Sequence, residues 1–328
     1  MKPAEKTILT AALIAVSGAA VVLSLSLGST FISPYALIQA LGGDRDSIEF
    51  IILTKLRLPR LFMALAVGAS LAVSGALYQS LLRNPLADPY TIGVSGGASL
   101  GATVAIVASL SAAWVVFAAF TGAIAVIAAV YLLARRLRMG NTPLILGGIA
   151  LSFIFSSAVM LLFSVSRAEQ VHRALMWLMG DLGIARYAIL LPGSLLALAL
   201  AVLSWAHARQ LDILSFGESF AKGLGVSRAE IVRIFWIGSM LAAVSVALAG
   251  VIGFVGLIVP HVVRLVSGPG HRRLLPYSAL AGGAFLALAD AAGRAIVPPY
   301  EIPAGVITGF FGGIFFLGLL LARGRDAA

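Results

Sequence analysis

The chain has 328 residues, of which 60% are hydrophobic and 11% are charged, and its mean hydropathy is +1.04. This composition excludes an ordinary water-soluble domain, and the absence of cysteine excludes disulfides and thiolate metal sites. A net charge of +10 would point to nucleic acid in a soluble protein, but in a membrane protein it reflects basic residues on the cytoplasmic side. We therefore expect no nucleic-acid partner.

Apolar runs long enough to cross or enter a bilayer recur along the whole chain. A helix needs about 20 apolar residues to span a hydrocarbon core of roughly 30 Å. The sequence predicts an all-α, polytopic membrane protein with about ten transmembrane helices in a single domain over residues 1–328. The predicted spans are 8–27, 61–82, 93–109, 112–134, 144–165, 188–206, 234–250, 251–266, 276–296 and 303–322.

The first run follows Lys2 and Lys6, which is also the pattern of a signal peptide. Because the run is longer than a usual signal-peptide core and no small-residue cleavage site follows it, we expect it to remain as the first membrane helix. With the N-terminus inside, the cytoplasmic loops carry most of the basic residues. Both termini are therefore predicted to be cytoplasmic.

Two segments between the spans are predicted to lie along the outer surface. Ser33 and Pro34 form an N-cap and a first-turn proline for a short helix over 35–41. Residues 168–187 are mixed in polarity, and Trp177 among them is a plausible interfacial anchor.

The gate segment, residues 83–90, is the sharpest polar interruption between two spans. Pro85 and Pro89 remove backbone donors and push the preceding residues out of helical geometry. Asn84 and Asp88 can cap helix ends. Irregular backbone at membrane depth is tolerated only where it is buried in protein or lines a cavity. A plain turn between two helices explains the segment as well.

The coupling segment, residues 211–228, is amphipathic and is expected on the cytoplasmic side. It is predicted to form two short helices, one ending near Gly223–Gly225 and the next capped at Ser227. Phe216, Phe220 and Leu224 recur at helical spacing among charged residues. This stripe indicates either an interfacial helix lying on lipid or a docking surface for a soluble partner.

Several motifs in order along the chain resemble those of the FecCD-type permeases, the membrane subunits of binding-protein-dependent ABC importers for iron chelates, haem and vitamin B12. The motifs are Arg57-Leu-Pro-Arg60, Asn84-Pro-Leu-Ala-Asp-Pro89, Gly93-Val-Ser-Gly-Gly97, Leu214-Ser-Phe-Gly-Glu218 with Ala221-Lys-Gly-Leu-Gly225, and Gly253-Phe-Val-Gly-Leu-Ile-Val-Pro-His261-Val-Val-Arg264. The resemblance covers essentially the whole chain.

The resemblance implies an ABC type II importer permease that forms a homodimer of ten-helix subunits around a central path in the inner membrane. Two cytoplasmic ATPase subunits would dock on the coupling segment, and a periplasmic or lipid-anchored substrate-binding protein would dock outside. The implied ATPase contacts are Ser215, Phe216, Gly217, Glu218, Phe220, Ala221, Lys222, Gly223, Leu224 and Gly225. The implied cytoplasmic gate is Asn84, Leu86, Asn141 and Thr142.

The outer arginine cluster, Arg57, Arg60 and Arg294, would by the same resemblance meet acidic residues of the binding protein. Two other roles remain open for these arginines. They could snorkel to lipid headgroups, or they could pair with Glu49, Asp290 or Glu301.

The chain lacks the Gly-x-x-x-x-Gly-Lys-Ser/Thr motif of phosphate-cradling loops, so ATP and Mg are expected on the partner ATPase and no cofactor on this chain. Ion-coupled carriers usually keep acidic or histidine groups inside the membrane, and here only Asp290 and His261 qualify. His172, His207, His261 and His271 show no metal-ligand spacing, so no bound metal is expected. These points favour an ATP-driven transporter subunit that is not itself an enzyme.

The motifs leave the substrate open. We expect an iron chelate, either a ferric siderophore or haem, with cobalamin as the alternative. A different class of function comes from Gly93-Val-Ser95-Gly, which matches the Gly-x-Ser-Gly pattern of intramembrane serine proteases, with His261 as the base. Such a tetrapeptide arises readily in a chain rich in Gly, Ala and Ser, and serine packs well between membrane helices.

Overall fold

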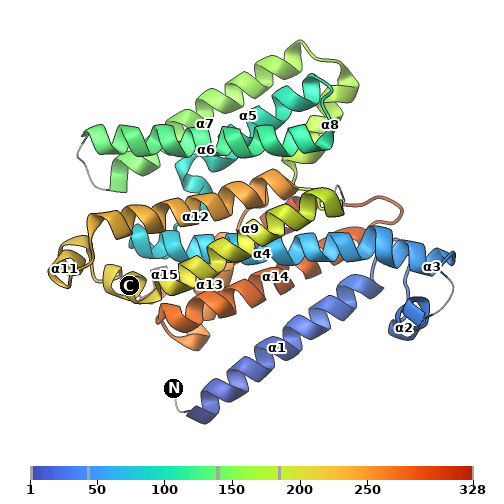
Figure 1. Ribbon diagram of the computed structural model, residues 1–328, viewed down its shortest axis with the longest axis horizontal. Coiled ribbons are helices and arrows are strands. Elements are labelled where there is room, and N and C mark those ends of the chain that lie inside the picture. Colours follow the sequence, from blue (N-terminus) through green and yellow to red (C-terminus); the bar gives the residue numbers. More distant parts are fainter. Residues whose placement is uncertain (1–2, 43–44, 138–140, 184–185, 327–328) are drawn as a thin grey trace.

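The computed structural model describes residues 3–42, 45–137, 141–183 and 186–326, and this part of the chain folds into helices without strands (Figure 1). Each of the ten predicted spans coincides with a helix. Seven of the described helical stretches are long and apolar enough to cross a membrane, and three more apolar helical stretches are shorter.

The helices that carry the long stretches are α1 (Pro3–Ser26), α4 (Leu58–Leu81), α6 (Ala112–Leu137), α7 (Asn141–Ser164), α9 (Tyr187–Ala206), α12 (Arg228–Ala249) and α14 (His271–Ala295). Those that carry the shorter stretches are α5 (Val94–Val107), α13 (Val255–Ser267) and α15 (Ala304–Asp326). The connecting elements are α2 (Pro34–Gly42), α3 (Ile48–Ile51), the π-helix η1 (Ile52–Arg57), the 3₁₀-helix η2 (Pro89–Ile92), α8 (Ala168–Leu178), α10 (Ala208–Leu214) and α11 (Glu218–Gly223).

The second membrane helix begins earlier than predicted. The predicted span starts at residue 61, whereas the helix runs without a break from Ile48 to Leu81. At 1.5 Å per residue its 34 residues extend about 51 Å, which is longer than a hydrocarbon core of roughly 30 Å. Basic residues interrupt the apolar run here, so the sequence did not predict this helix start. Pro59 is accommodated because the preceding turn is a π-helix, in which the N–H of Leu58 bonds the carbonyl of Leu53.

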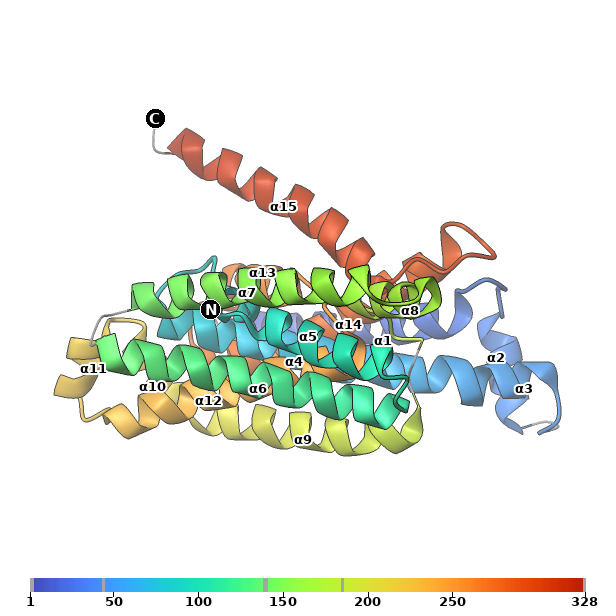
Figure 2. The same ribbon diagram turned by 90° about the horizontal axis from the view of Figure 1, so that it is seen from above.

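The helix α4 lies at the centre of the bundle and packs against α9, α12, α13 and α14 (Figure 1). The helices α5, α6 and α7 pack on one another and form a layer on one side, while α1 packs against α14 on the other. The helix α15 diverges from the rest of the bundle, which is plain in the view from above (Figure 2). The core is therefore built around α4, whose two ends lead into η1 and into the gate segment.

Glycines let α4 approach its neighbours at backbone contact. A Cβ atom added at Gly75 would lie 1.8 Å from the carbonyl oxygen of Gly256 in α13. At the other crossing, a Cβ at Gly68 would lie 2.2 Å from the carbonyl oxygen of Gly282 in α14. Small residues at membrane helix crossings permit this close packing. These contacts bring α14 and α13 onto α4 about two turns apart.

Two of the apolar helices are too short to cross the whole bundle, and each begins after a break in the α-helical structure. The helix α5 has 14 residues and α13 has 13, so each extends only about 20 Å. Irregular backbone precedes both of them, and Gly93 and Gly250 adopt positive φ angles of 86° and 73° at these breaks. Phe254, at the N-terminus of α13, also has a positive φ of 68°. The predicted spans 234–250 and 251–266 are thus separated by a short non-helical segment.

Candidate functional site

The coupling segment contains the predicted short helix and the predicted cap at Ser227, but the helix that this cap begins is the long membrane helix α12 rather than a second short helix. The helix α11 ends at Gly223, and α12 begins after Ser227, whose hydroxyl accepts from the N–H of Glu230 at 3.2 Å. The carboxylate of Glu230 in turn accepts from the N–H of Ser227 at 2.8 Å, which completes a capping box. The start of α12 is therefore firmly defined.

One face of the coupling segment is anchored and the other is free. The anchoring side chains are buried, and they are Leu211, Leu214, Ala221 and Val226. Phe216, Phe220 and Leu224 are 75%, 53% and 57% exposed, and the two phenylalanine rings lie 5.7 Å apart. On the same segment, Lys222 and Glu218 form an exposed ion pair at 2.8 Å. Aromatic side chains this exposed are suited to binding a second surface.

The gate segment lies at the same end of the bundle as the coupling segment. The side-chain oxygen of Asn84 accepts from the N–H of Leu86 at 3.0 Å, and that of Asp88 accepts from the N–H of Tyr90 at 2.8 Å. Desolvation raises the pKa of Asp88 to about 6, although the hydrogen bond from Tyr90 opposes this shift. Asp88 thus caps η2 as predicted, whereas Asn84 stabilises a turn rather than a helix end. Arg83 adopts a positive φ of 52° at the turn out of α4.

The remaining predicted gate residues, Asn141 and Thr142, begin α7, but their side chains lie outside the described part of the structure. The helix α7 packs against η2, because a Cβ added at Gly148 would lie 2.6 Å from the backbone of Ile92. The helix that begins with Asn141 and Thr142 therefore contacts η2, the element that follows the turn of Asn84 and Leu86.

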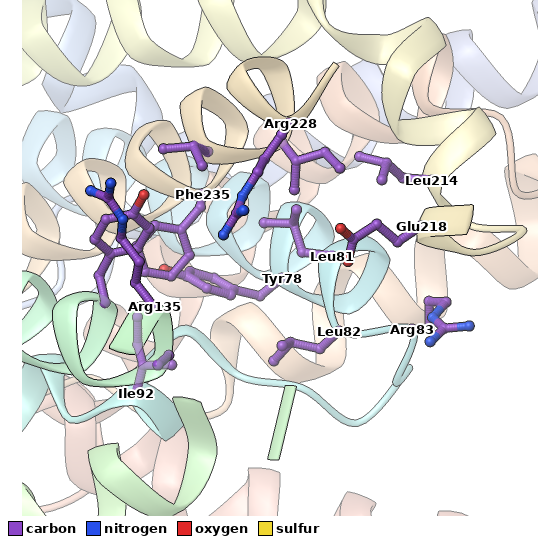
Figure 3. Close-up of a pocket in the computed structure, with 14 residues that line it drawn as sticks. Tyr78, Leu81, Leu82, Arg83, Ile92, Arg135, Leu214, Glu218, Arg228 and Phe235 are labelled. Atoms are coloured by element: carbon purple, nitrogen blue, oxygen red, sulfur yellow. The ribbon is translucent and has the colours of Figure 1, made fainter. Parts of the chain in front are cut away.

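A cavity of about 250 Å³ is lined by the end of α4, the coupling segment, α6 and α12 (Figure 3). Its polar lining includes Arg83, Arg135, Arg228 and Glu218, and its apolar lining includes Leu81, Leu214 and Phe235. Figure 3 shows Arg135 and Arg228 approaching it from one side and Glu218 from the other. Residues of the gate segment and of the coupling segment thus line the same cavity.

The outer arginine cluster is brought together at the opposite end of the bundle. Arg60 donates to Asp290 at 2.8 Å and to Glu301 at 2.6 Å, and Arg294 donates to the second oxygen of Asp290 at 3.0 Å. Arg57 donates to the carbonyls of Leu25, Ser26 and Thr30. All three arginines are at most 9% exposed. Pairing with Asp290 or Glu301, one of the alternatives open from the sequence, is what the structure shows for Arg60 and Arg294, whereas Arg57 bonds backbone carbonyls instead.

The same arginines line an outer cavity of about 500 Å³. Its charged lining also contains Lys55, Arg186 and Glu301. Five basic side chains against one acidic side chain give this hollow a positive potential. Unlike the three arginines of the cluster, Lys55 and Arg186 are exposed.

Metal binding and serine proteolysis gain no support from the described residues. Among the described residues no group of three or more His, Asp or Glu side chains is placed to hold a metal ion. Ser95 lies in the first turn of α5, and His261 lies within α13. Neither placement adds support for a serine protease.

Comparison with known proteins identifies the family. The model of the FecCD transport family matches residues 9–322. The haemin transport permease of Yersinia pestis is 39% identical over 275 residues, which cover 82% of each chain. The cobalamin import permease of Halobacterium salinarum is 42% identical over 278 residues, which cover 83% of this chain and 74% of the relative.

A solved ABC transporter assigned to the metal-chelate type, in an inward-facing conformation, superposes with a TM-score of 0.86 at 32% identity. The match covers 97% of this chain and 99% of that one. The family, the apolar helices and the fold agree that the chain is a multi-pass membrane protein. The chain is a member of the FecCD transport family.

Proposed function

We propose that the chain is the membrane-spanning permease subunit of an ATP-driven ABC importer that moves an iron chelate, a ferric siderophore or haem, into the cytoplasm. The observation that carries this proposal is the agreement of nearly the whole fold with a metal-chelate type ABC transporter. The haemin permease among the relatives supports an iron-containing cargo. The cobalamin permease keeps vitamin B12 as the alternative, since its identity to this chain is similar.

The working unit in this proposal is a homodimer in the inner membrane, with both termini cytoplasmic and residues 1–328 forming one transmembrane domain. The divergence of α15 supports a second copy, because its exposed side chains Phe310, Phe311 and Leu317 have no cover within the chain (Figure 2). ATP and Mg belong to two separate ATPase subunits, so this chain performs no bond chemistry and binds no cofactor.

The proposed mechanism uses the two ends of the bundle in turn. Closure of the ATPases on ATP displaces the coupling segment, whose docking surface is formed by Ser215, Phe216, Gly217, Glu218, Phe220, Lys222, Gly223, Leu224 and Gly225. Ala221, expected in this surface from the sequence, is buried and anchors the segment instead. The displacement moves the gate formed by Asn84, Leu86, Asn141 and Thr142. The binding protein delivers its cargo at the outer arginine cluster, Arg57, Arg60 and Arg294.

The outer cavity yields a test of binding-protein docking that spares the fold. Arg57, Arg60 and Arg294 are tied to partners within the chain, so reversing their charge would disturb folding as well as docking. We expect Lys55→Glu with Arg186→Glu, which alters two exposed side chains of the same cavity, to weaken binding-protein affinity severalfold at low salt and less at high salt.

Affinity is measured by titrating the binding protein onto the reconstituted permease at two ionic strengths. Arg45→Glu, on the same outer side but outside the lining of the cavity, serves as the control. Equal affinity of the double variant and the native chain at low salt would contradict docking at this cavity.

The proposed function is tested by uptake into vesicles that hold the chain with its ATPase and enclosed ATP, and with binding protein outside. Ferric siderophore, haem and cobalamin are offered in parallel. We expect ATP-dependent accumulation of one of the two iron compounds. Accumulation of cobalamin alone would select the alternative, and no accumulation of any of them by an assembled complex that hydrolyses ATP would refute both.

A further inference from the structure

A buried histidine connects three elements at the end of the bundle that carries the coupling segment. His271, the first residue of α14, is 2% exposed. Its backbone N and its ring Nδ1 lie 2.8 and 2.7 Å from the same oxygen, Oδ1 of Asp212 in α10. Its other ring nitrogen, Nε2, lies 2.6 Å from the hydroxyl oxygen of Ser80, in the last turns of α4. One side chain thus joins α10, α14 and α4.

These hydrogen bonds link the carboxylate of Asp212 to the end of α4 through the imidazole ring. Nε2 of His271 shares a hydrogen bond with the hydroxyl of Ser80, whose oxygen also lies 3.0 Å from the carbonyl oxygen of Ala76. Oδ1 of Asp212 accepts from Nδ1–H and from the backbone N–H of His271. Burial alone would raise the pKa of Asp212, but its hydrogen bonds with His271 lower it overall. A charge-assisted pair of this kind is shorter and stronger than a neutral hydrogen bond.

The order Asp212–His271–Ser80 resembles that of a hydrolase triad, but its surroundings exclude that role. Ser80 is 4% exposed, and its hydroxyl contacts the carbonyl of Ala76 in its own helix as well as His271. A nucleophile must reach its substrate, and this one is enclosed by α4 and α14. The three residues therefore hold helices together and do not form a catalytic site.

The three residues lie on a path from the coupling segment to the gate segment. Asp212 lies in the coupling segment, which is the proposed ATPase contact. Ser80 is four residues before Asn84, where the gate segment leaves α4. The same end of α4 is held to α13 by Gln79, whose side chain donates to the carbonyl of Leu257 at 3.2 Å. A shift of α10 therefore either breaks the hydrogen bonds of His271 or moves the ends of α14 and α4 with it.

Apolar packing alone would couple movement of α10 to α4 and α14 less directly than hydrogen bonds do. Leu211 and Leu214 also bury α10 against the bundle, but dispersion contacts are individually weak and non-directional. Hydrogen bonds weaken steeply with distance and angle. We infer that His271 is a positioning residue that transmits movement of the coupling segment to the end of α4 that leads into the gate. This inference rests on the proposed function.

The inference is tested in the reconstituted complex of permease, ATPase and binding protein by measuring substrate moved per ATP hydrolysed. We expect His271→Ala and Ser80→Ala each to keep ATP hydrolysis within about twofold of the native complex and to lower this ratio about tenfold, the size of a lost charge-assisted hydrogen bond. Ser80→Thr keeps the hydroxyl, so this variant should retain the native ratio of substrate moved to ATP hydrolysed.

His207→Ala is the matched control. His207 is also a buried histidine, and its Nδ1 bonds the carbonyl of Leu203 in the preceding turn of its own helix rather than a different helix. The ratio should therefore be unchanged in this variant. Equal losses of transport and of ATP hydrolysis in the Ser80 and His271 variants would mean a structural role only, and would overturn the inference.

A second readout reports movement directly. Because the chain has no cysteine, Leu86→Cys gives a single labelling site in the gate segment. ATP should change the mobility of a label at this site in the native background and leave it unchanged with His271→Ala, while the ATPase stays assembled. A label response that survives in His271→Ala would refute the link. Failure of the native chain to assemble with any ATPase would instead count against the proposed function.

Discussion

Replacement of Phe216 and Phe220 by aspartate will prevent stable assembly with the ATPase while leaving the permease folded. The two rings are 75% and 53% exposed and lie 5.7 Å apart. Buried aromatic anchors dominate the free energy of protein interfaces, and truncation of one commonly costs 2 kcal/mol or more. Loss of both, with two carboxylates brought into the contact, should weaken assembly by at least about a hundredfold, since each 1.4 kcal/mol is a factor of about ten.

The measurement is co-purification of the ATPase with the permease, followed by titration of the two purified components. The control is Phe31→Asp, which changes a phenylalanine of similar exposure, 69%, on the loop between α1 and α2. Size-exclusion profiles should match those of the native chain for both variants, because neither site lies in the core. Retention of full ATPase binding by the double variant would show that this face lies on lipid, the other interpretation of the stripe.

Replacement of Asp290 by asparagine should remove most of the folded protein. Asp290 is 1% exposed and accepts from Arg60 with one oxygen and from Arg294 with the other. Breaking a buried ion pair by removal of one partner typically costs about 3–5 kcal/mol, because the remaining charge is left without compensation. Here two guanidinium groups, both at most 9% exposed, would lose their shared carboxylate.

The yield and thermal stability of the detergent-solubilised permease test this expectation. Glu301→Gln is the comparison, since Glu301 bonds the same Arg60 but its side chain is 44% exposed. Exposed pairs contribute about 0–1 kcal/mol, so this variant should stay close to the native chain. Similar stability of the Asp290 and Glu301 variants would show that the outer cluster contributes little to folding.

The sequence predicted most features that depend on local pattern. Apolar run length placed all ten membrane helices, since burial in lipid demands a continuous apolar stretch. The caps at Ser33 and Ser227 were likewise readable, because an N-cap bonds backbone groups only a few residues away. Helix starts obscured by charge were not readable, as the extension from residue 61 back to Ile48 shows.

The partners of charged and polar side chains were decided by the tertiary structure. The sequence left Arg60 with several candidate partners, and the fold pairs it with Asp290, 230 residues away. It offered no signal for His271, which the fold places between Asp212 and Ser80, the latter 191 residues distant. Apolar periodicity and capping are local interactions, whereas these hydrogen bonds exist only once glycine-mediated contacts bring α4, α13 and α14 together. The sequence by itself thus determined the positions of the membrane helices and the family motifs, and the packing of helices determined which charges meet.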